Sequence, residues 1–371
     1  MADHLPWHHF TSPLHQWSVM PTFLVGEYMF IGCAIAALVH AQRNGRGFLL
    51  IWFAALTAGT ANDLIFMALP LVDNFWQAQA TIMLTPRLPL YIPCVYVCFL
   101  YYPTITARRL RMSSWATAAL AGLLGLLYYA PYDIVGAKFL WWTWHDTDQP
   151  IATRLLGAPV SSSLWVVTFV SSFAWLIGRA LRDDVELSAA TFAKGFALVA
   201  GLTTALMLVQ MTILQQLDGG PPGYIAFATA LLLYAALAWS GRAASAPQQA
   251  LPDRFAQRVI VAHYATLVLL MAAFAPETHS STGVHQLTGP CYVEATDVTG
   301  LTRYEFLCAD DFDEDYTFAC TTPPPAGSQW YTVCAKPHGN FAAWMGSVGL
   351  LGLIGISVLT TLCGVVRRAV V

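Results

Sequence analysis

The chain has 371 residues, of which 57% are hydrophobic and only 11% are charged, and its mean hydropathy is +0.55. Ordinary soluble domains carry roughly 25% charged residues, so the apolar excess must face lipid rather than water. The formal net charge of -3 excludes a nucleic-acid binder that depends on bulk positive charge. The composition therefore predicts an all-α polytopic integral membrane protein, surrounded by membrane lipids and without a nucleic-acid partner.

Long apolar runs predict about nine transmembrane helices, because a helix needs about 20 mostly apolar residues to cross hydrocarbon. In chain order, we expect spans near Met20–Ala41, Gly47–Pro70, Thr81–Tyr102, Ser113–Tyr129, Val160–Gly178, Thr191–Leu214, Tyr224–Trp239, Val259–Ala275 and Phe341–Val366. We expect an N-terminal tail over 1–19, an eight-helix bundle over 20–275, a polar loop over 276–339 and a final span with a short tail over 340–371. The tail lacks a basic stretch, so the first span is expected to remain as an anchor rather than be cleaved.

Basic residues are distributed unevenly between the two sides of this arrangement. The connections after the first, third, fifth and seventh spans, together with the C-terminal tail, hold twelve of the 18 Lys and Arg residues. Short cytoplasmic loops are enriched in Lys and Arg. The pattern therefore predicts an extracytoplasmic N-terminus and a cytoplasmic C-terminus, in the plasma membrane or a secretory-pathway membrane.

The 276–339 loop contains four of the eight cysteines, Cys291, Cys308, Cys320 and Cys334. Clustered cysteines in a non-membrane segment indicate disulfides on an oxidising face, and four cysteines allow three pairings. A zinc site is disfavoured because the spacings of 17, 12 and 14 contain no close Cys-x-x-Cys pair. We expect a small disulfide-bonded extracytoplasmic loop domain, on which a protein partner would dock.

Three charged residues lie inside predicted spans at a similar depth. Glu27, Asp63 and Arg87 are each about six or seven residues from the outer end of a span, or roughly 10 Å below the boundary. Buried charges in membranes often mark functional sites, and Pro86 and Pro89 predict a broken helix beside Arg87. The alternative is structural: Arg87 snorkels outward or forms an ion pair with one of the carboxylates.

A tryptophan-rich segment over 131–157 follows the fourth span and lies on the outer side. Trp141, Trp142 and Trp144 predict an interfacial helix or a re-entrant piece, because indole favours the boundary between lipid and water. The segment would lie directly above the depth of the three buried charges.

His145, Asp146 and Asp148 come immediately after these tryptophans. A histidine with two carboxylates suits either a divalent metal or acid-base chemistry. The alternative is a solvated turn in which Asp146 or Asp148 caps the next short helix. The sequence leaves these three interpretations open, so a divalent metal is an optional cofactor.

The same segment resembles an uncharacterised family of eukaryotic multi-pass membrane proteins. The matching positions are Pro131, Tyr132, Asp133, Gly136, Ala137, Lys138, the run Trp-Trp-Thr-Trp-His-Asp-Thr-Asp over 141–148, and Arg154. The likeness extends over the first five spans and implies no activity. A fainter likeness, based on acidic and Trp-rich motifs near helix ends, links the chain to membrane carotenoid-modifying proteins, the hydratases and lycopene cyclases.

These features together predict a polar, Trp-walled cavity in the outer half of the bilayer that binds, and optionally modifies, a lipid-like or isoprenoid substrate. We expect the substrate site to contain Glu27, Arg87, Trp141, Trp142, Trp144 and Asp148. In an enzyme, Asp63 or Asp146 would donate a proton, His145 would be the base or a metal ligand, and Arg87 would hold an anionic headgroup. The alternatives are a transporter or small-ligand receptor that uses the same charges, and a structural or assembly protein.

Overall fold

The computed structural model describes residues 5–72, 74–145, 148–181, 187–241, 252–310 and 315–364, most of which are helical. The α-helices are α1 (Pro13–Val19), α2 (Pro21–Asn44), α3 (Arg46–Ala68), α4 (Tyr91–Arg108), α5 (Ser114–Lys138), α6 (Gln149–Ala152), α7 (Val160–Ala180), α8 (Ala189–Gln215), α9 (Tyr224–Ser240), α10 (Arg254–Ala273) and α11 (Phe341–Gly364). The strands are β1 (Phe75–Gln77), β2 (Trp142–Trp144), β3 (Arg154–Leu155), β4 (Ala158–Pro159), β5 (Ser280–Val284), β6 (Glu294–Thr296), β7 (Thr302–Tyr304), β8 (Tyr316–Thr317) and β9 (Trp330–Ala335). Two 3-10 helices cover Gln216–Asp218 and Pro276–Thr278.

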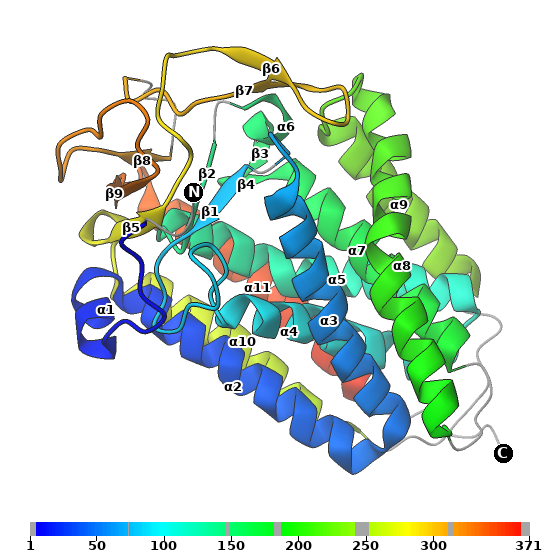
Figure 1. The fold of residues 1–371 in the computed structure, drawn as a ribbon. Helices are drawn as coiled ribbons and strands as arrows, with labels where there is room; N and C mark the ends of the chain where they lie inside the picture. The colour runs from blue at the N-terminus through cyan, green and yellow to red at the C-terminus, as the bar shows by residue number, and fades with distance from the viewer. Residues whose placement is uncertain are drawn as a thin grey trace, which may run out of the picture.

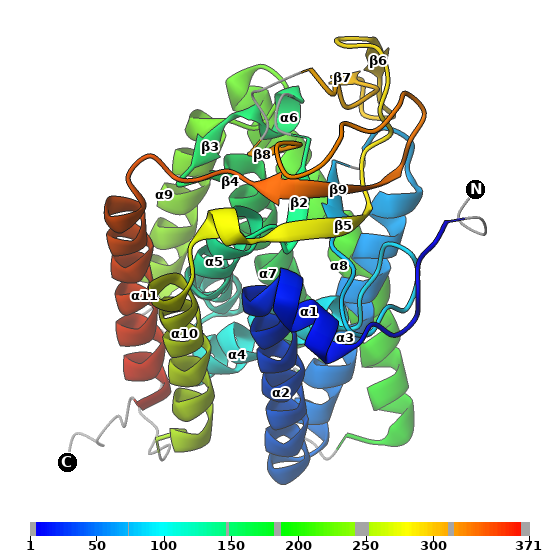
Figure 2. The ribbon, with the colours of Figure 1, turned by 90° about the vertical axis from the view of Figure 1, so that its left-hand side faces the viewer.

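The long helices pack side by side as a bundle, and the strands gather at one end of it (Figures 1 and 2). At this end, the Thr22 hydroxyl at the start of α2 accepts a hydrogen bond from the Trp141 indole at 3.0 Å and lies 3.0 Å from His279 Nε2. The start of α2 therefore lies beside the segments that follow α5 and α10.

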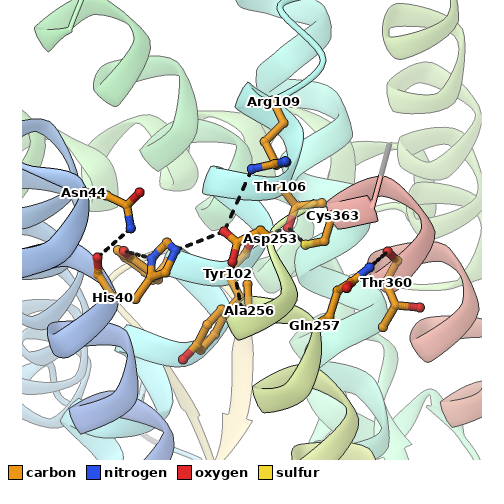
Figure 3. A network of polar contacts seen from close by, with 11 residues as sticks. His40, Asn44, Tyr102, Thr106, Arg109, Asp253, Ala256, Gln257, Thr360 and Cys363 are labelled. Carbon is orange, nitrogen blue, oxygen red and sulfur yellow. Dashed lines mark hydrogen bonds and ion pairs between the residues drawn. The ribbon is translucent and has the colours of Figure 1, made fainter. Parts of the chain in front are cut away.

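A second polar network joins helix ends at the opposite end of the bundle (Figure 3). His40, near the end of α2, lies 2.7 Å from the Tyr101 hydroxyl and 2.9 Å from Asp253, the N-cap of α10. Arg109, which ends α4, lies 3.9 Å from the same carboxylate. Burial alone would raise the pKa of Asp253, but hydrogen bonds from His40 and the Ala256 backbone lower it below its ordinary value. An ionised carboxylate thus links three helices.

Seven helices in the described part of the chain are long and apolar enough to cross a membrane: α2, α3, α5, α7, α8 extended by its following 3-10 turn, α10 and α11. Helix α9 is apolar but has only 17 residues. Helix α4 has 18 residues, and its tyrosines and prolines make its sequence less apolar than those of the other long helices. Of the nine predicted spans, seven therefore correspond to helices that are long and apolar enough to cross a membrane.

The third predicted span is wrong over its first half. Helix α4 begins only at Tyr91, and Arg87 lies in the irregular loop before it. Pro86 and Pro89 explain the difference, because each lacks the backbone N–H that an α-helix requires. Almost every side chain of α4 is buried, so this helix lies in the bundle interior rather than against lipid.

Of the two forms predicted for the Trp-rich segment, an interfacial helix or a re-entrant piece, the structure contradicts the interfacial helix. Helix α5 continues into this segment, and β2 pairs antiparallel with β1, with Trp144 opposite Phe75. Trp141 and Trp142 are only 0% and 2% exposed, because each ring packs on a glycine. A Cβ at Gly26 would lie 2.2 Å from the Trp141 ring, and a Cβ at Gly136 would lie 2.2 Å from the Trp142 ring. These two tryptophans therefore occupy the protein interior.

The segment between α10 and α11 contains two disulfides, Cys291–Cys308 and Cys320–Cys334. This confirms the predicted disulfide bonding and selects one of its three pairings. Strand β9 lies between β5 and β8, whereas β6 and β7 form a separate hairpin. Strand β5 lies against β1, where a Cβ at Gly283 would come within 3.2 Å of the Gln77 carbonyl oxygen. The disulfide-bonded segment thus covers the strand-bearing end of the bundle.

Candidate functional site

A cavity of about 210 Å³ lies among α3, α4, α5, α7 and α8, beneath the β6–β7 hairpin. A single buried water requires roughly 10–15 Å³ on the same measure, so this space is larger than a packing defect. Its walls are mostly apolar and aromatic, with a few polar groups, as in typical small-molecule sites.

Six aromatic rings form a continuous row along the cavity wall. In order they are Trp165, Tyr96, Phe99, Tyr129, Tyr132 and Trp142, with neighbouring ring centroids 5.0–5.8 Å apart. Residues 96 and 99 of α4, and residues 129 and 132 of α5, are each three positions apart. Side chains at this spacing share one face of a helix. Two helices therefore each contribute two rings to the row.

A buried carboxyl group, Asp63 of α3, lies at the cavity beside this row. It accepts a hydrogen bond from the Tyr96 hydroxyl, and Asn62 donates to the same hydroxyl at 3.3 Å. The Thr204 hydroxyl of α8 in turn donates to Asn62 at 3.3 Å. Burying a carboxyl group is unfavourable without such partners. The contacts fix Asp63 and Tyr96 in place and connect three helices.

The cavity wall also contains two buried indole N–H groups, those of Trp142 and Trp144. Neither has a hydrogen-bond partner among the described residues. The benzo edge of Trp142 packs on Gly136, which leaves the Nε1 edge on the other side of the ring. Buried donors without partners are rare in folded proteins. The two donors are therefore enclosed within the cavity wall rather than facing the open space.

Asp133 of α5 lies behind the aromatic row and is only 1% exposed. The hydroxyls of Ser162 and Tyr129, both from the cavity wall, lie beside it. Neither carboxyl oxygen meets hydrogen-bond geometry with another described residue. A second carboxyl group is thus buried next to the cavity.

Arg303 of β7 closes the outer end of the cavity. Its Nη2 lies 2.5 Å from Asp148 Oδ2, and its Nη1 lies 2.9 Å from Asp297 Oδ2. All three side chains are at most 4% exposed. Burial alone would raise the pKa of Asp297, but hydrogen bonds from Thr299 and Arg303 lower it below its ordinary value. The ion pairs attach the disulfide-bonded segment to the Trp-rich segment.

The predicted site residues divide into those at the cavity and those elsewhere. Asp63, Trp142 and Trp144 line the cavity. Asp148 reaches it through its ion pair with Arg303, which also lines it. These four predicted residues are therefore brought to one place.

The predicted common site for Glu27, Asp63 and Arg87 is wrong. Glu27 accepts hydrogen bonds from the backbone N–H groups of Thr81 and Ile82, at 3.0 Å and 3.2 Å, and from the Thr81 hydroxyl. It therefore fastens the loop before α4 to α2. Neither Glu27 nor Arg87 lines the cavity.

Arg87 and Trp141 instead make contacts that stabilise the fold outside the cavity. Arg87 donates to the Phe75 carbonyl at 3.0 Å, and its guanidinium lies 5.7 Å from the centroid of the Trp76 ring. Arg87 lines a separate outer hollow together with His285. Trp141 packs on α2 and does not line the cavity.

The described part of the chain contains only two residues of the predicted metal set, His145 and Asp148. His145 is buried, and its backbone N–H donates to the Asn74 carbonyl at 3.1 Å. Asp148 is paired with Arg303, and Asp146 lies outside the described residues. The described residues contain no group of three or more His, Cys, Asp or Glu side chains that could hold a metal ion.

The sequence did not reveal most of the aromatic row, nor Arg303 at the outer end of the cavity. The spacing of Tyr96 with Phe99, and of Tyr129 with Tyr132, could have indicated aromatic faces on two neighbouring helices. Arg303 could have been noticed as one of very few basic residues on the predicted outer side. Its two acidic partners come from different segments, which only the fold brings together.

The described part of the chain is a mostly helical protein with two disulfides, and its seven long apolar helices are compatible with an integral membrane protein. The chain belongs to the family described as a domain of unknown function (DUF7802), whose family model matches residues 6–363. No curated protein and no solved structure matches the chain. The likeness to carotenoid-modifying proteins stays a prediction.

Proposed function

We propose that the protein binds an amphiphilic, lipid-like or isoprenoid ligand in the cavity beneath the β6–β7 hairpin. The observation that carries this proposal is the combination of a 210 Å³ space, an aromatic wall and a buried carboxyl group, Asp63, at the cavity. An apolar ligand body would replace lipid contacts with aromatic ones, and a polar end would lie beside Asp63.

The position of the cavity suits a ligand that arrives from the bilayer. Phe66 of α3 and Leu208 of α8 both line the cavity. Leu208 is also 38% exposed on the bundle surface. The wall of the cavity at Leu208 therefore reaches the apolar outer surface of the bundle. A wall that reaches this surface favours a membrane-soluble ligand over a small inorganic ion.

We propose that the strand-covered end faces the outside and the Arg-rich helix ends face the cytoplasm. The disulfides support this orientation because they persist on an oxidising face. A thiol-specific, membrane-impermeant label tests it on intact cells. It should label Gly339→Cys, at an exposed position beside the disulfide-bonded segment, and not Gln42→Cys, at an exposed position near the end of α2. The reverse pattern would overturn the orientation.

The proposal is confined to ligand binding. Of the three predicted catalytic residues, Asp63 lines the cavity, His145 does not, and Asp146 lies outside the described residues. Of the three, Asp63 is therefore the one that stays a candidate catalytic residue if the ligand is modified.

Filling the cavity tests the proposal directly. Ser161→Phe should place a ring in the cavity, because Ser161 lines it, whereas Ser347→Phe adds the same ring on the exposed face of α11. Organic extracts of the purified proteins, analysed by mass spectrometry, should contain a molecule that wild type and S347F retain and S161F loses. Identical extracts from all three proteins would contradict the proposal.

A further inference from the structure

We infer that the ligand of this cavity is a cation, namely a protonated amine or quaternary ammonium group on an apolar body. The inference rests on the proposed function and names the chemical class of its ligand. It is carried by the placement of Asp63 beside the aromatic row.

The charges at the cavity are predominantly negative. Among the described residues that line it, the ionisable acids and bases are Asp63, Asp297 and Arg303. Arg303 is bonded to both Asp297 and Asp148, so this group sums to +1 − 2 = −1 when all three are ionised. Asp63 adds a further carboxyl group beside the aromatic row. A bound cation would offset this excess in a poorly solvated space, where charge interactions are strong.

The aromatic row favours the same ligand charge. The face of a Trp or Tyr ring is electronegative, and a cation within about 6 Å of its centroid is attracted to it. Tyr96 combines both features, because its hydroxyl is bonded to Asp63 and its ring centroid lies 5.8 Å from that of Trp165. An anionic group placed here would be repelled by the carboxyl group and by the ring faces.

The expected anchor for an anionic headgroup is missing from the cavity. Sequence reasoning assigned that role to Arg87, which lies in the loop before α4 and lines a different hollow. The cation that does line the cavity, Arg303, is already bonded to two carboxylates.

Three probes of equal chain length separate ligand charge from ligand size. Octylammonium, 1-octanol and octanoate are titrated at pH 7 into the full-length protein in maltoside micelles, and binding is followed by calorimetry. We expect octylammonium to bind at least tenfold more tightly than 1-octanol, and octanoate to bind most weakly. Asp63→Asn should reduce octylammonium affinity to the level of 1-octanol. The matched control Glu294→Gln removes an exposed carboxylate from the same end of the molecule and should change neither affinity.

The outcomes distinguish the proposal that the cavity binds an amphiphile from the inference that this amphiphile is a cation. Equal binding of octylammonium and 1-octanol by the wild type would overturn the cation inference and leave amphiphile binding intact. Failure of all three probes to bind would overturn both. Choline, added as a fourth probe, identifies the source: binding as tight as that of octylammonium indicates a water-soluble ammonium compound, and weaker binding indicates a membrane amphiphile.

A second variant protects the test against misfolding of D63N. Trp165→Leu leaves every carboxyl group in place and removes one ring face from the row. It should weaken octylammonium binding severalfold more than 1-octanol binding. An equal loss for both probes would show that the ring acts only as an apolar surface, which contradicts the inference.

Discussion

The guanidinium of Arg303 lies 2.5 Å from the carboxylate of Asp148, and these residues are 155 positions apart in the chain. The contact joins the β6–β7 hairpin to the end of the Trp-rich segment directly over the cavity. Both side chains are buried, so their mutual pairing is required to offset the loss of hydration. The cover of the cavity is thus held by an ion pair between two distant segments.

Removing Arg303 should therefore be costly. Arg303→Ala leaves Asp148 and Asp297 buried without their cation, and we expect the free energy of unfolding to fall by about 3–5 kcal/mol. Thermal denaturation in detergent measures this change. The control is Arg154→Ala: Arg154 is 16% exposed, but its partner Asp315 is 42% exposed and stays hydrated when the arginine is removed, so we expect a smaller loss. Equal losses for the two variants would contradict the assigned role of Arg303.

Close packing of Trp141 on α2 gives a second prediction. Gly26→Ala would place a methyl group 2.2 Å from the Trp141 ring, so the ring must shift. We expect a loss of about 1–3 kcal/mol in stability, as for other overpacked cores. Gly32→Ala on the same helix meets nothing within 4 Å and should be neutral or stabilising. The two melting temperatures, compared directly, check the contact, and similar values would contradict it.

Much of the fold could be predicted from the sequence, because apolar runs and clustered cysteines are local signals. The seven membrane-compatible helices and the disulfide bonding followed from them. The position of Arg87 did not, since it depends on where a proline-interrupted segment first becomes helical. Glu27 was misassigned because its partners at Thr81 and Ile82 are more than 50 positions away.

The candidate site was predictable only in part, for a similar reason. Asp63 stood out as a carboxyl group in an apolar run, and it does line the cavity. The burial of Trp141 and Trp142 depends on Gly26 and Gly136, which complement the rings from separate helices. Tryptophan alone is as typical of the membrane interface as of the protein interior. A single sequence does not show which glycine packs against which tryptophan when the two are far apart in the chain.

Two buried histidines in the disulfide-bonded segment predict sensitivity to acid. Burial lowers the pKa of His279 to about 4 and that of His285 to about 3, although backbone hydrogen bonds oppose this effect. The unfolded state takes up a proton near pH 6.5 and the folded state does not. Stability is therefore complete above pH 6.5 and decreases as the pH falls, by up to about 1.4 kcal/mol per pH unit for each histidine.

The dependence of melting temperature on pH between 7 and 4.5 measures this effect. His279→Asn and His285→Gln should each flatten the curve, because a neutral side chain has no proton to take up. His15→Gln, at an exposed position, should leave the slope unchanged. A wild-type melting temperature that is constant over this range would contradict the assignment of neutral, buried imidazoles.

The two disulfides should differ in their effect on the cavity. Cys291–Cys308 encloses the β6–β7 hairpin that carries Arg303, whereas Cys320–Cys334 encloses a segment that does not line the cavity. Replacing the first pair with serine should weaken octylammonium binding at least tenfold. Replacing the second should lower the melting temperature with little change in affinity. Calorimetry of the two double variants checks this, and equal affinities would show that the hairpin is positioned without its disulfide.

The central claim is that the cavity beside Asp63 holds a ligand. The most direct test is an electron cryomicroscopy map of the protein purified from its own membrane without added amphiphiles. We expect non-protein density between Trp142 and Trp165, with a polar group near Asp63. A cavity that contains only ordered water, or that is closed by inward movement of its side chains, would contradict the claim.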